Sequence, residues 1–210
     1  MSEMNGVAAT GAQSPRRASA GPSFETIAIA SSAGGLAALT RLLSRLPGTL
    51  PASVLVVQHL DPRHESLMAD ILSRRTPLVV KQAEDGERLE PGTVYIAPPD
   101  KHLLATVDRT LSLTQSELVH FVRPSADLLF ESVAAAFRDR AIAVVLTGSG
   151  RDGAMGVVAI KKMGGTVIAQ DEASSEFSAM PSAAIETGQV DFVLPLDEIA
   201  GALVSLTVGS

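Results

Sequence analysis

Short apolar runs of the kind that form buried strands alternate along this chain with segments of helical periodicity. Residues 27–29, 53–57 and 141–146 are the clearest runs, and the last is the most strongly strand-like stretch of the sequence. After the first run, five leucines recur on one helical face before Pro47: Leu36, Leu39, Leu42, Leu43 and Leu46. Parallel strands need a crossover, usually a helix. The alternation therefore predicts an α/β fold with a doubly wound, mostly parallel sheet and Rossmann-like layers of helices on both faces.

One segment departs from this alternation. Residues 103–107 and 111–113 flank Asp108-Arg109 and predict an antiparallel hairpin. The other predicted strands are residues 78–81, 94–97, 166–169 and 190–194. The other predicted helices are residues 67–75, 126–137 with Ser125 as N-cap, 157–163, 181–187 and 196–206.

The composition fits one folded domain that follows a tail. Residues 1–23 are rich in Gly, Ala and Ser and show no periodicity, which predicts a disordered tail. Residues 24–210 are predicted to form a single domain. Hydrophobic residues make up 46% of the chain and aromatic residues only 3%, so we expect an aliphatic core of the kind that parallel sheets bury.

Charge and composition exclude several classes of function. The net charge of −6 disfavours a nucleic-acid binder that neutralises phosphates. Because there is no Cys, we exclude disulfides, thiolate zinc sites and cysteine nucleophiles, and we expect the protein in the reducing cytoplasm. Charged residues interrupt every apolar run, and nothing in residues 1–23 has the hydrophobic stretch of a signal peptide. We therefore expect neither membrane insertion nor export.

Three polar residues each follow the end of a predicted strand: Ser32, His59 and Asp152. The carboxyl ends of parallel strands meet at one edge of a sheet, so these side chains converge if their strands are neighbours. A serine hydroxyl needs a base to take its proton, and a neutral imidazole suits that task. A carboxylate on the other ring nitrogen fixes the tautomer, so the three residues form a candidate catalytic triad.

Each member also has a simpler interpretation. Ser31 or Ser32 can serve only as a helix cap, which is the commoner role of serine before a helix. His59 taken alone is a hydrogen-bonded loop histidine, and Asp152 can cap a helix that begins at Gly153. It is less common for all three residue types to follow equivalent strand ends by chance than for any one of them to do so.

Three other histidines compete for the role of base: His64, His102 and His120. None of them directly ends a strongly apolar strand. Asp61, His64 and Glu65 come nearest to a metal-ligand pattern, but their spacing favours a solvated helix start. We therefore predict no metal site and no cofactor.

Two glycine-containing turns follow the strands that precede Ser32 and Asp152. Their backbone N–H groups can hold an oxyanion or a substrate. The candidate residues are Ala33, Gly34, Gly35, Gly148, Ser149 and Gly150. Neither turn matches the Gly-x-Gly-x-x-Gly or the P-loop pattern, which leaves only a weak indication of nucleotide binding.

Several segments of the chain resemble the catalytic domain of the chemotaxis protein-glutamate methylesterase family (CheB). They cover about residues 27–200 in the family's order: residues 27–35, 56–60, 94–99, 123–125, 146–153 and 169–175. The resemblance implies a catalytic domain over residues 24–210 with Ser32 as nucleophile, His59 as base and Asp152 as orienting carboxylate. It also implies hydrolysis of glutamate γ-methyl esters on chemoreceptor-like helical proteins and, in many members, deamidation of receptor glutamines.

Three departures from the family pattern bear on these expectations. Ala33 stands where the family usually has Thr, and Ser149 replaces a bulkier residue, often Met. The family usually carries a phosphorylatable receiver domain, which residues 1–23 are too short to form. We therefore expect either an enzyme that is constitutively open or one that is controlled by a separate receiver or regulator protein.

Two other classes of function stay open at this point. The crevice can belong to an anion- or nucleotide-binding α/β module without hydrolytic activity. It can also belong to a binding module that docks a receptor helix and performs no chemistry.

Overall fold

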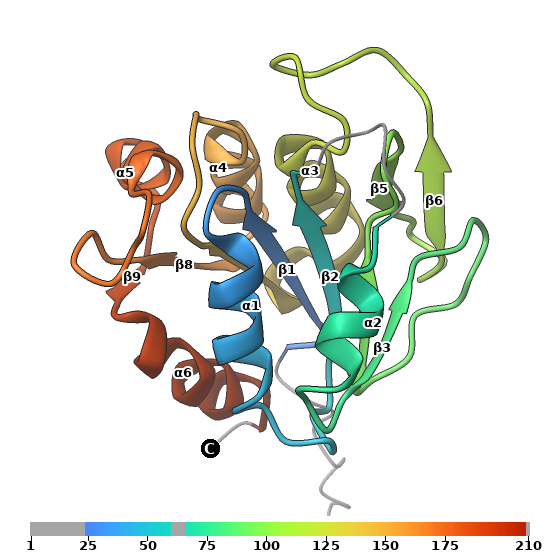
Figure 1. Ribbon diagram of the computed structural model, residues 1–210. Helices are drawn as coiled ribbons and strands as arrows, with labels where there is room; N and C mark the ends of the chain where they lie inside the picture. Colours follow the sequence, from blue (N-terminus) through green and yellow to red (C-terminus); the bar gives the residue numbers. More distant parts are fainter. Residues whose placement is uncertain (1–23, 60–65, 209–210) are drawn as a thin grey trace, which may run out of the picture.

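The computed structural model describes residues 24–59 and 66–208, and it is built on one parallel sheet (Figure 1). Seven strands lie in the order β3-β4-β2-β1-β7-β8-β9, and every adjacent pair is parallel. The strands of this sheet are β1 (Thr26–Ser31), β2 (Ser53–Gln58), β3 (Val79–Gln82), β4 (Thr93–Ile96), β7 (Ala141–Val145), β8 (Thr166–Gln170) and β9 (Phe192–Leu194).

Helices cover both faces of the sheet. They are α1 (Gly35–Leu43), α2 (Met68–Ser73), α3 (Ala126–Phe137), α4 (Ala154–Lys162), α5 (Ala179–Glu186) and α6 (Leu196–Val208), with a 3₁₀ turn η1 (Arg138–Arg140). Helices α1, α2 and α6 pack on one face. Helices α3, α4 and α5 pack on the other face, together with the antiparallel hairpin of β5 (His102–Ala105) and β6 (Leu111–Thr114).

The two faces of β1 show how the period of two along a strand divides the core. Ile27 and Ile29 belong to the apolar cluster under α1 and α6, whereas Ala28 and Ala30 belong to the cluster under α3. All four side chains are fully buried. Buried on both faces, this central strand has the continuous apolar sequence expected of a parallel sheet.

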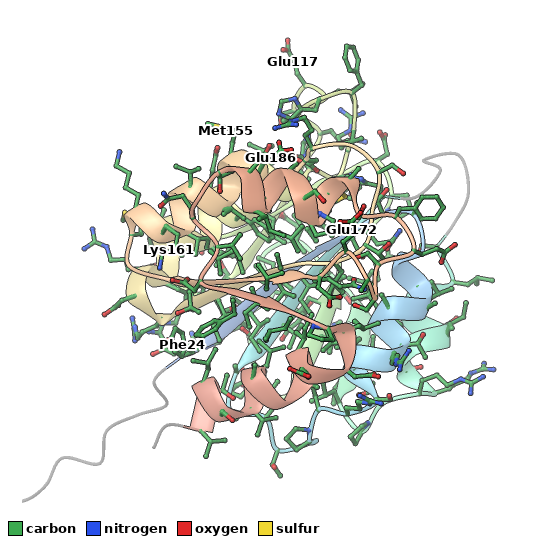
Figure 2. All side chains as sticks on the ribbon, turned by 90° about the vertical axis from the view of Figure 1, so that its left-hand side faces the viewer. Phe24, Glu117, Met155, Lys161, Glu172 and Glu186 are labelled. Carbon is green, nitrogen blue, oxygen red and sulfur yellow. The ribbon has the colours of Figure 1, made fainter. Side chains whose placement is uncertain are left out.

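The order of the strands reverses at β1. From β1 the chain crosses to β2 on one side, and it later returns through the hairpin and α3 to β7 on the other side. Ligands of open α/β sheets bind at the carboxyl ends of the strands where such a reversal occurs. Figure 2 shows the two edges: Phe24, before β1, lies opposite Glu172, which follows β8 at the carboxyl edge.

The predicted fold class is confirmed, and the errors of the sequence analysis lie at the ends of elements. The first helix ends at Leu43 and not near Leu46, although Leu46 is still buried in the core. Strand β5 ends at Ala105 because the turn begins earlier than predicted: Thr106 N–H bonds to Thr110 O at 2.9 Å, and Arg109 adopts φ of 61°. The tail prediction for residues 1–23 lies outside the described residues.

None of the helices within residues 24–59 and 66–208 combines the length and the apolar character that a membrane span needs.

Candidate active site

The end of β1 presents two consecutive serines in different environments. Ser31 is the last strand residue and is 0% exposed, and its Oγ donates to Gln58 Oε1 at 2.6 Å. Ser32 follows the strand and is partly exposed, with its backbone N–H bonded to Thr147 O at 3.1 Å. Of the two hydroxyl groups, that of Ser32 is therefore the one on an accessible residue.

A tight turn leads from Ser32 into α1. Gly34 is the N-cap residue with φ of 75°, in the left-handed region where a side chain is disfavoured. The N–H of Gly35 donates to Ser32 O at 2.9 Å and closes the turn. Ser32 therefore lies before the cap and does not itself cap α1.

His59 and Asp152 meet at the same edge of the sheet. His59 follows β2, and its Nε2 lies 2.8 Å from Oδ2 of Asp152, which follows β7. The imidazole is 14% exposed and the carboxyl group 4%. Because Nε2 faces the carboxylate, Nδ1 is the ring nitrogen left for another partner. The backbone N–H of His59 bonds to Ser31 O at 3.1 Å and ties the two strand ends together.

Asp152 also forms hydrogen bonds with the residues at the N-terminus of α3. Its carboxylate accepts hydrogen bonds from the Ser125 hydroxyl at 2.9 Å and from the backbone N–H groups of Ala126 at 2.6 Å and Asp127 at 3.1 Å. Burial alone would raise the pKa of Asp152, but the bonds from His59 and from the α3 backbone outweigh it and lower that pKa. The site thus holds an ionised carboxylate against an imidazole.

The alternative role of Asp152 as the cap of the following helix is wrong. The N-cap of α4 is Gly153, and no side chain bonds there. Ser125 caps α3 as predicted, since its Oγ accepts from Leu128 N–H. Its second contact, the donated bond to Asp152, joins residues 27 positions apart and was not foreseen.

The competing histidines have other environments. His102 is fully buried, with Nδ1 accepting from Ser125 N–H at 3.1 Å and Nε2 facing Glu117 O at 3.0 Å, so it is a neutral structural residue. His120 is 60% exposed, and its Nε2 lies 3.3 Å from Asp127 Oδ2. His64, together with Asp61 and Glu65, lies outside the described residues.

Asp127, which the sequence analysis did not identify, is a buried carboxylate beside the site. Its Oδ1 accepts from Gly156 N–H at 2.7 Å, whereas Oδ2 has no hydrogen bond to any residue that the structure describes, although His120 Nε2 lies 3.3 Å away. Burial raises the pKa of Asp127, and the charge of Asp152 adds to the rise. An acidic residue in the first turn of a helix was visible in the sequence, but it is too common a feature to mark a site.

The loop after β7 packs against the Ser32 turn. The Thr147 hydroxyl lies 3.0 Å from Ala33 O and joins the two turns. A Cβ added at Gly148 would lie 2.9 Å from Ser32 Cβ and 2.3 Å from Sδ of Met180, so only glycine fits there. Met180 is a further neighbour of the site that sequence reasoning missed.

The predicted oxyanion donors divide into two groups. The N–H of Gly35 is bonded to Ser32 O, and that of Gly148 to Phe177 O at 2.9 Å, so neither is available to a substrate. The remaining candidates have no N–H partner among residues 24–59 and 66–208: Ala33, Gly34, Ser149 and Gly150. Within the same ranges, no set of three His, Cys, Asp or Glu side chains is placed to hold a metal ion.

Comparisons with known proteins agree on one family. The family model described as CheB methylesterase matches residues 27–203. A relative from Leptospira interrogans is 40% identical over 183 residues, which are 87% of this chain and 95% of the relative.

A protein-glutamate methylesterase/protein-glutamine glutaminase from Pyrococcus horikoshii is 42% identical over 186 residues, but this chain spans only 50% of its length. The crystal structure of the Thermotoga maritima CheB methylesterase catalytic domain superposes with a TM-score of 0.85 at 39% identity, covering 88% of this chain and 100% of that one. The chain therefore belongs to the CheB methylesterase family.

Proposed function

We propose that this protein is a cytoplasmic protein-glutamate methylesterase whose nucleophile is Ser32. Its substrate is a glutamate γ-methyl ester on a chemoreceptor-like helical protein. One observation carries the proposal: the 2.8 Å contact of His59 with the buried, ionised Asp152, at the carboxyl edge where Ser32 follows the neighbouring strand β1. Relatives named for this activity support the choice of substrate class.

In the first half of the reaction, His59 Nδ1 takes the proton of the Ser32 hydroxyl as Oγ bonds to the ester carbonyl carbon. The N–H groups of Ala33 and Ser149, which have no partner among the described residues, hold the resulting oxyanion. Asp152 stabilises the imidazolium through Nε2. The bond from carbon to the methoxy oxygen then breaks, and methanol leaves with the proton from His59.

In the second half, a water molecule gives a proton to His59 and attacks the acyl-enzyme carbonyl. The ester bond to Ser32 breaks, Oγ regains its proton, and a glutamate side chain is released. The same steps on a glutamine side chain would release ammonia in place of methanol. The double name of the relatives, which includes protein-glutamine glutaminase, supports this second substrate.

Mass spectrometry after treatment with a fluorophosphonate tests the nucleophile. We expect one adduct on Ser32 of the wild-type protein and none in the Ser32→Ala variant. The untreated wild-type protein should release methanol from a methyl-esterified receptor peptide, and neither the labelled protein nor the variant should do so. An adduct on Ser31, or methanol release by Ser32→Ala at the original rate, would rule out this nucleophile. Absence of both adduct and methanol release would favour a binding module over an enzyme.

A further inference from the structure

Gln58, the last residue of β2, makes three hydrogen bonds around the strand ends that carry Ser32 and His59. Its side-chain Nε2 donates to Ser32 O at 2.7 Å and to His59 O at 3.0 Å. Its Oε1 accepts from the hydroxyl of Ser31 at 2.6 Å. Gln58 is 5% exposed; its bond with Ser31 is buried, and its bonds to Ser32 O and His59 O are partly buried.

The chemistry of the neighbours fixes the orientation of this amide. Both groups near Nε2 are carbonyl oxygens, which only accept hydrogen bonds, whereas the group near Oε1 is a hydroxyl, which can donate. A flipped amide would place its oxygen against the carbonyl oxygens of Ser32 and His59. One NH₂ group therefore bridges the main chains of both residues.

The space that Gln58 occupies depends on Gly35. A Cβ added at Gly35 would lie 1.9 Å from Gln58 Oε1 and 2.9 Å from Ser31 Cβ. Gly35 is not among the residues with positive φ, whereas Gly34 is. Glycine is thus required at these two adjacent positions for different reasons. Gly34 adopts a backbone conformation that disfavours a side chain, and Gly35 leaves the room that the Gln58 amide needs.

We infer that Gln58 is a positioning residue, which sets the separation between the Ser32 hydroxyl and the His59 imidazole. The inference rests on the proposed function of these two residues. With both main-chain carbonyl groups held by one amide, the two strand ends keep a fixed separation. Loss of the bridge lets the two strand ends move relative to one another, and displacements of this kind slow an oriented proton transfer.

The experiment compares Gln58→Met with the wild-type protein. Methionine keeps the approximate length of the side chain and removes all three hydrogen bonds. We expect kcat for a peptide glutamate γ-methyl ester to fall roughly 100-fold, with KM changed by less than about twofold. The rate of fluorophosphonate labelling at Ser32 should fall in parallel, because it depends on the same proton transfer.

Thr26→Val provides a matched control at the opposite end of the same two strands. The Thr26 hydroxyl bonds to the Ser53 hydroxyl at 3.0 Å, and both residues are buried. Its replacement removes a buried hydrogen bond between β1 and β2 without touching the site. We expect a loss of unfolding free energy that is smaller than that of Gln58→Met, because fewer hydrogen bonds are lost, and an unchanged kcat.

Gln58→Glu separates the bridge from the contact with Ser31. A glutamate retains an acceptor for the Ser31 hydroxyl but loses at least one of the two donated bonds, so we expect kcat to fall here too. Wild-type kcat and labelling rate in Gln58→Met, or in Gln58→Glu should the first variant not fold, would overturn the inference. Undiminished activity of Ser32→Ala would instead overturn the proposed function, whatever the Gln58 variants do.

Discussion

The two edges of the sheet each hold a carboxylate, and the two are stabilised by different kinds of partner. At the amino edge, Glu25 forms ion pairs with Arg109 at 2.5 Å and with Arg140, both of which are more than 40% exposed. At the carboxyl edge, Asp152 is bonded to the imidazole of His59, to a hydroxyl and to two backbone N–H groups. No Lys or Arg of residues 24–59 and 66–208 pairs with it.

The difference in partners suits Glu25 to a structural role and Asp152 to supporting proton transfer. A guanidinium group stays protonated throughout the accessible pH range, so it neither accepts nor releases a proton during a reaction. An imidazole can gain and lose a proton near neutrality, and a carboxylate held by dipoles stabilises the charged ring when it forms. Four substitutions test this division between the edges.

The largest effect is expected for Ser32→Ala. Turnover of a methyl-ester peptide should fall by roughly 10⁴- to 10⁶-fold, because the proposed nucleophile is removed. The melting temperature should stay near that of the wild-type protein, since no hydrogen bond of the Ser32 side chain to another described residue is lost. Methanol release and thermal unfolding measure the two quantities. A large loss of stability would mean that the hydroxyl has a structural role.

Asp152→Asn should reduce turnover by roughly 10⁴-fold, because an amide favours the wrong tautomer of His59. It should also change the pH dependence of unfolding. The pKa of Asp152 is lowered from 3.8, so its ionised form stabilises the fold above about pH 4, and this contribution disappears as the pH falls through the lowered pKa.

The stability difference between the wild-type protein and Asp152→Asn should therefore be largest near neutral pH and shrink below about pH 4. Chemical denaturation at a series of pH values measures it. A difference that is independent of pH would show that the carboxylate contributes through its shape and not through its charge.

Ser125→Ala should have an intermediate effect. It removes one hydrogen bond to Asp152 and the N-cap of α3, so we expect about 1 kcal/mol lower unfolding free energy and roughly 10-fold lower turnover. Ser125→Thr keeps a hydroxyl and serves as the control. Equal turnover in the alanine variant and in the wild-type protein would limit Ser125 to its capping role.

The smallest effect is expected at the amino edge. Glu25→Gln weakens two partly exposed ion pairs, so the unfolding free energy should fall by less than about 1 kcal/mol, and the loss should diminish at about 1 M salt. Turnover should not change. A reduced turnover in this variant would contradict the separation of the two edges.

The sequence allowed the alternation of strands and helices to be predicted, because the period of two and the helical spacing are local properties. The positions of Ser32, His59 and Asp152 at strand ends followed from the same pattern, and the structure places those strands side by side in the order β2-β1-β7. The hydrogen bonds from α3 to Asp152 could not be predicted from this pattern. They depend on how a helix that is distant in sequence packs at the sheet edge, which no spacing along the chain encodes.

The inward direction of Ser31 has a practical consequence. Since that hydroxyl is fully enclosed and bonded to Gln58, it cannot take over when its neighbour is replaced. On the proposed mechanism, a protein with alanine at position 32 should therefore keep its surface and lose its esterase activity, with no residual activity from Ser31. Immobilised on a resin, such a variant is expected to retain the proposed substrates, methyl-esterified proteins, from a cell extract without cleaving them.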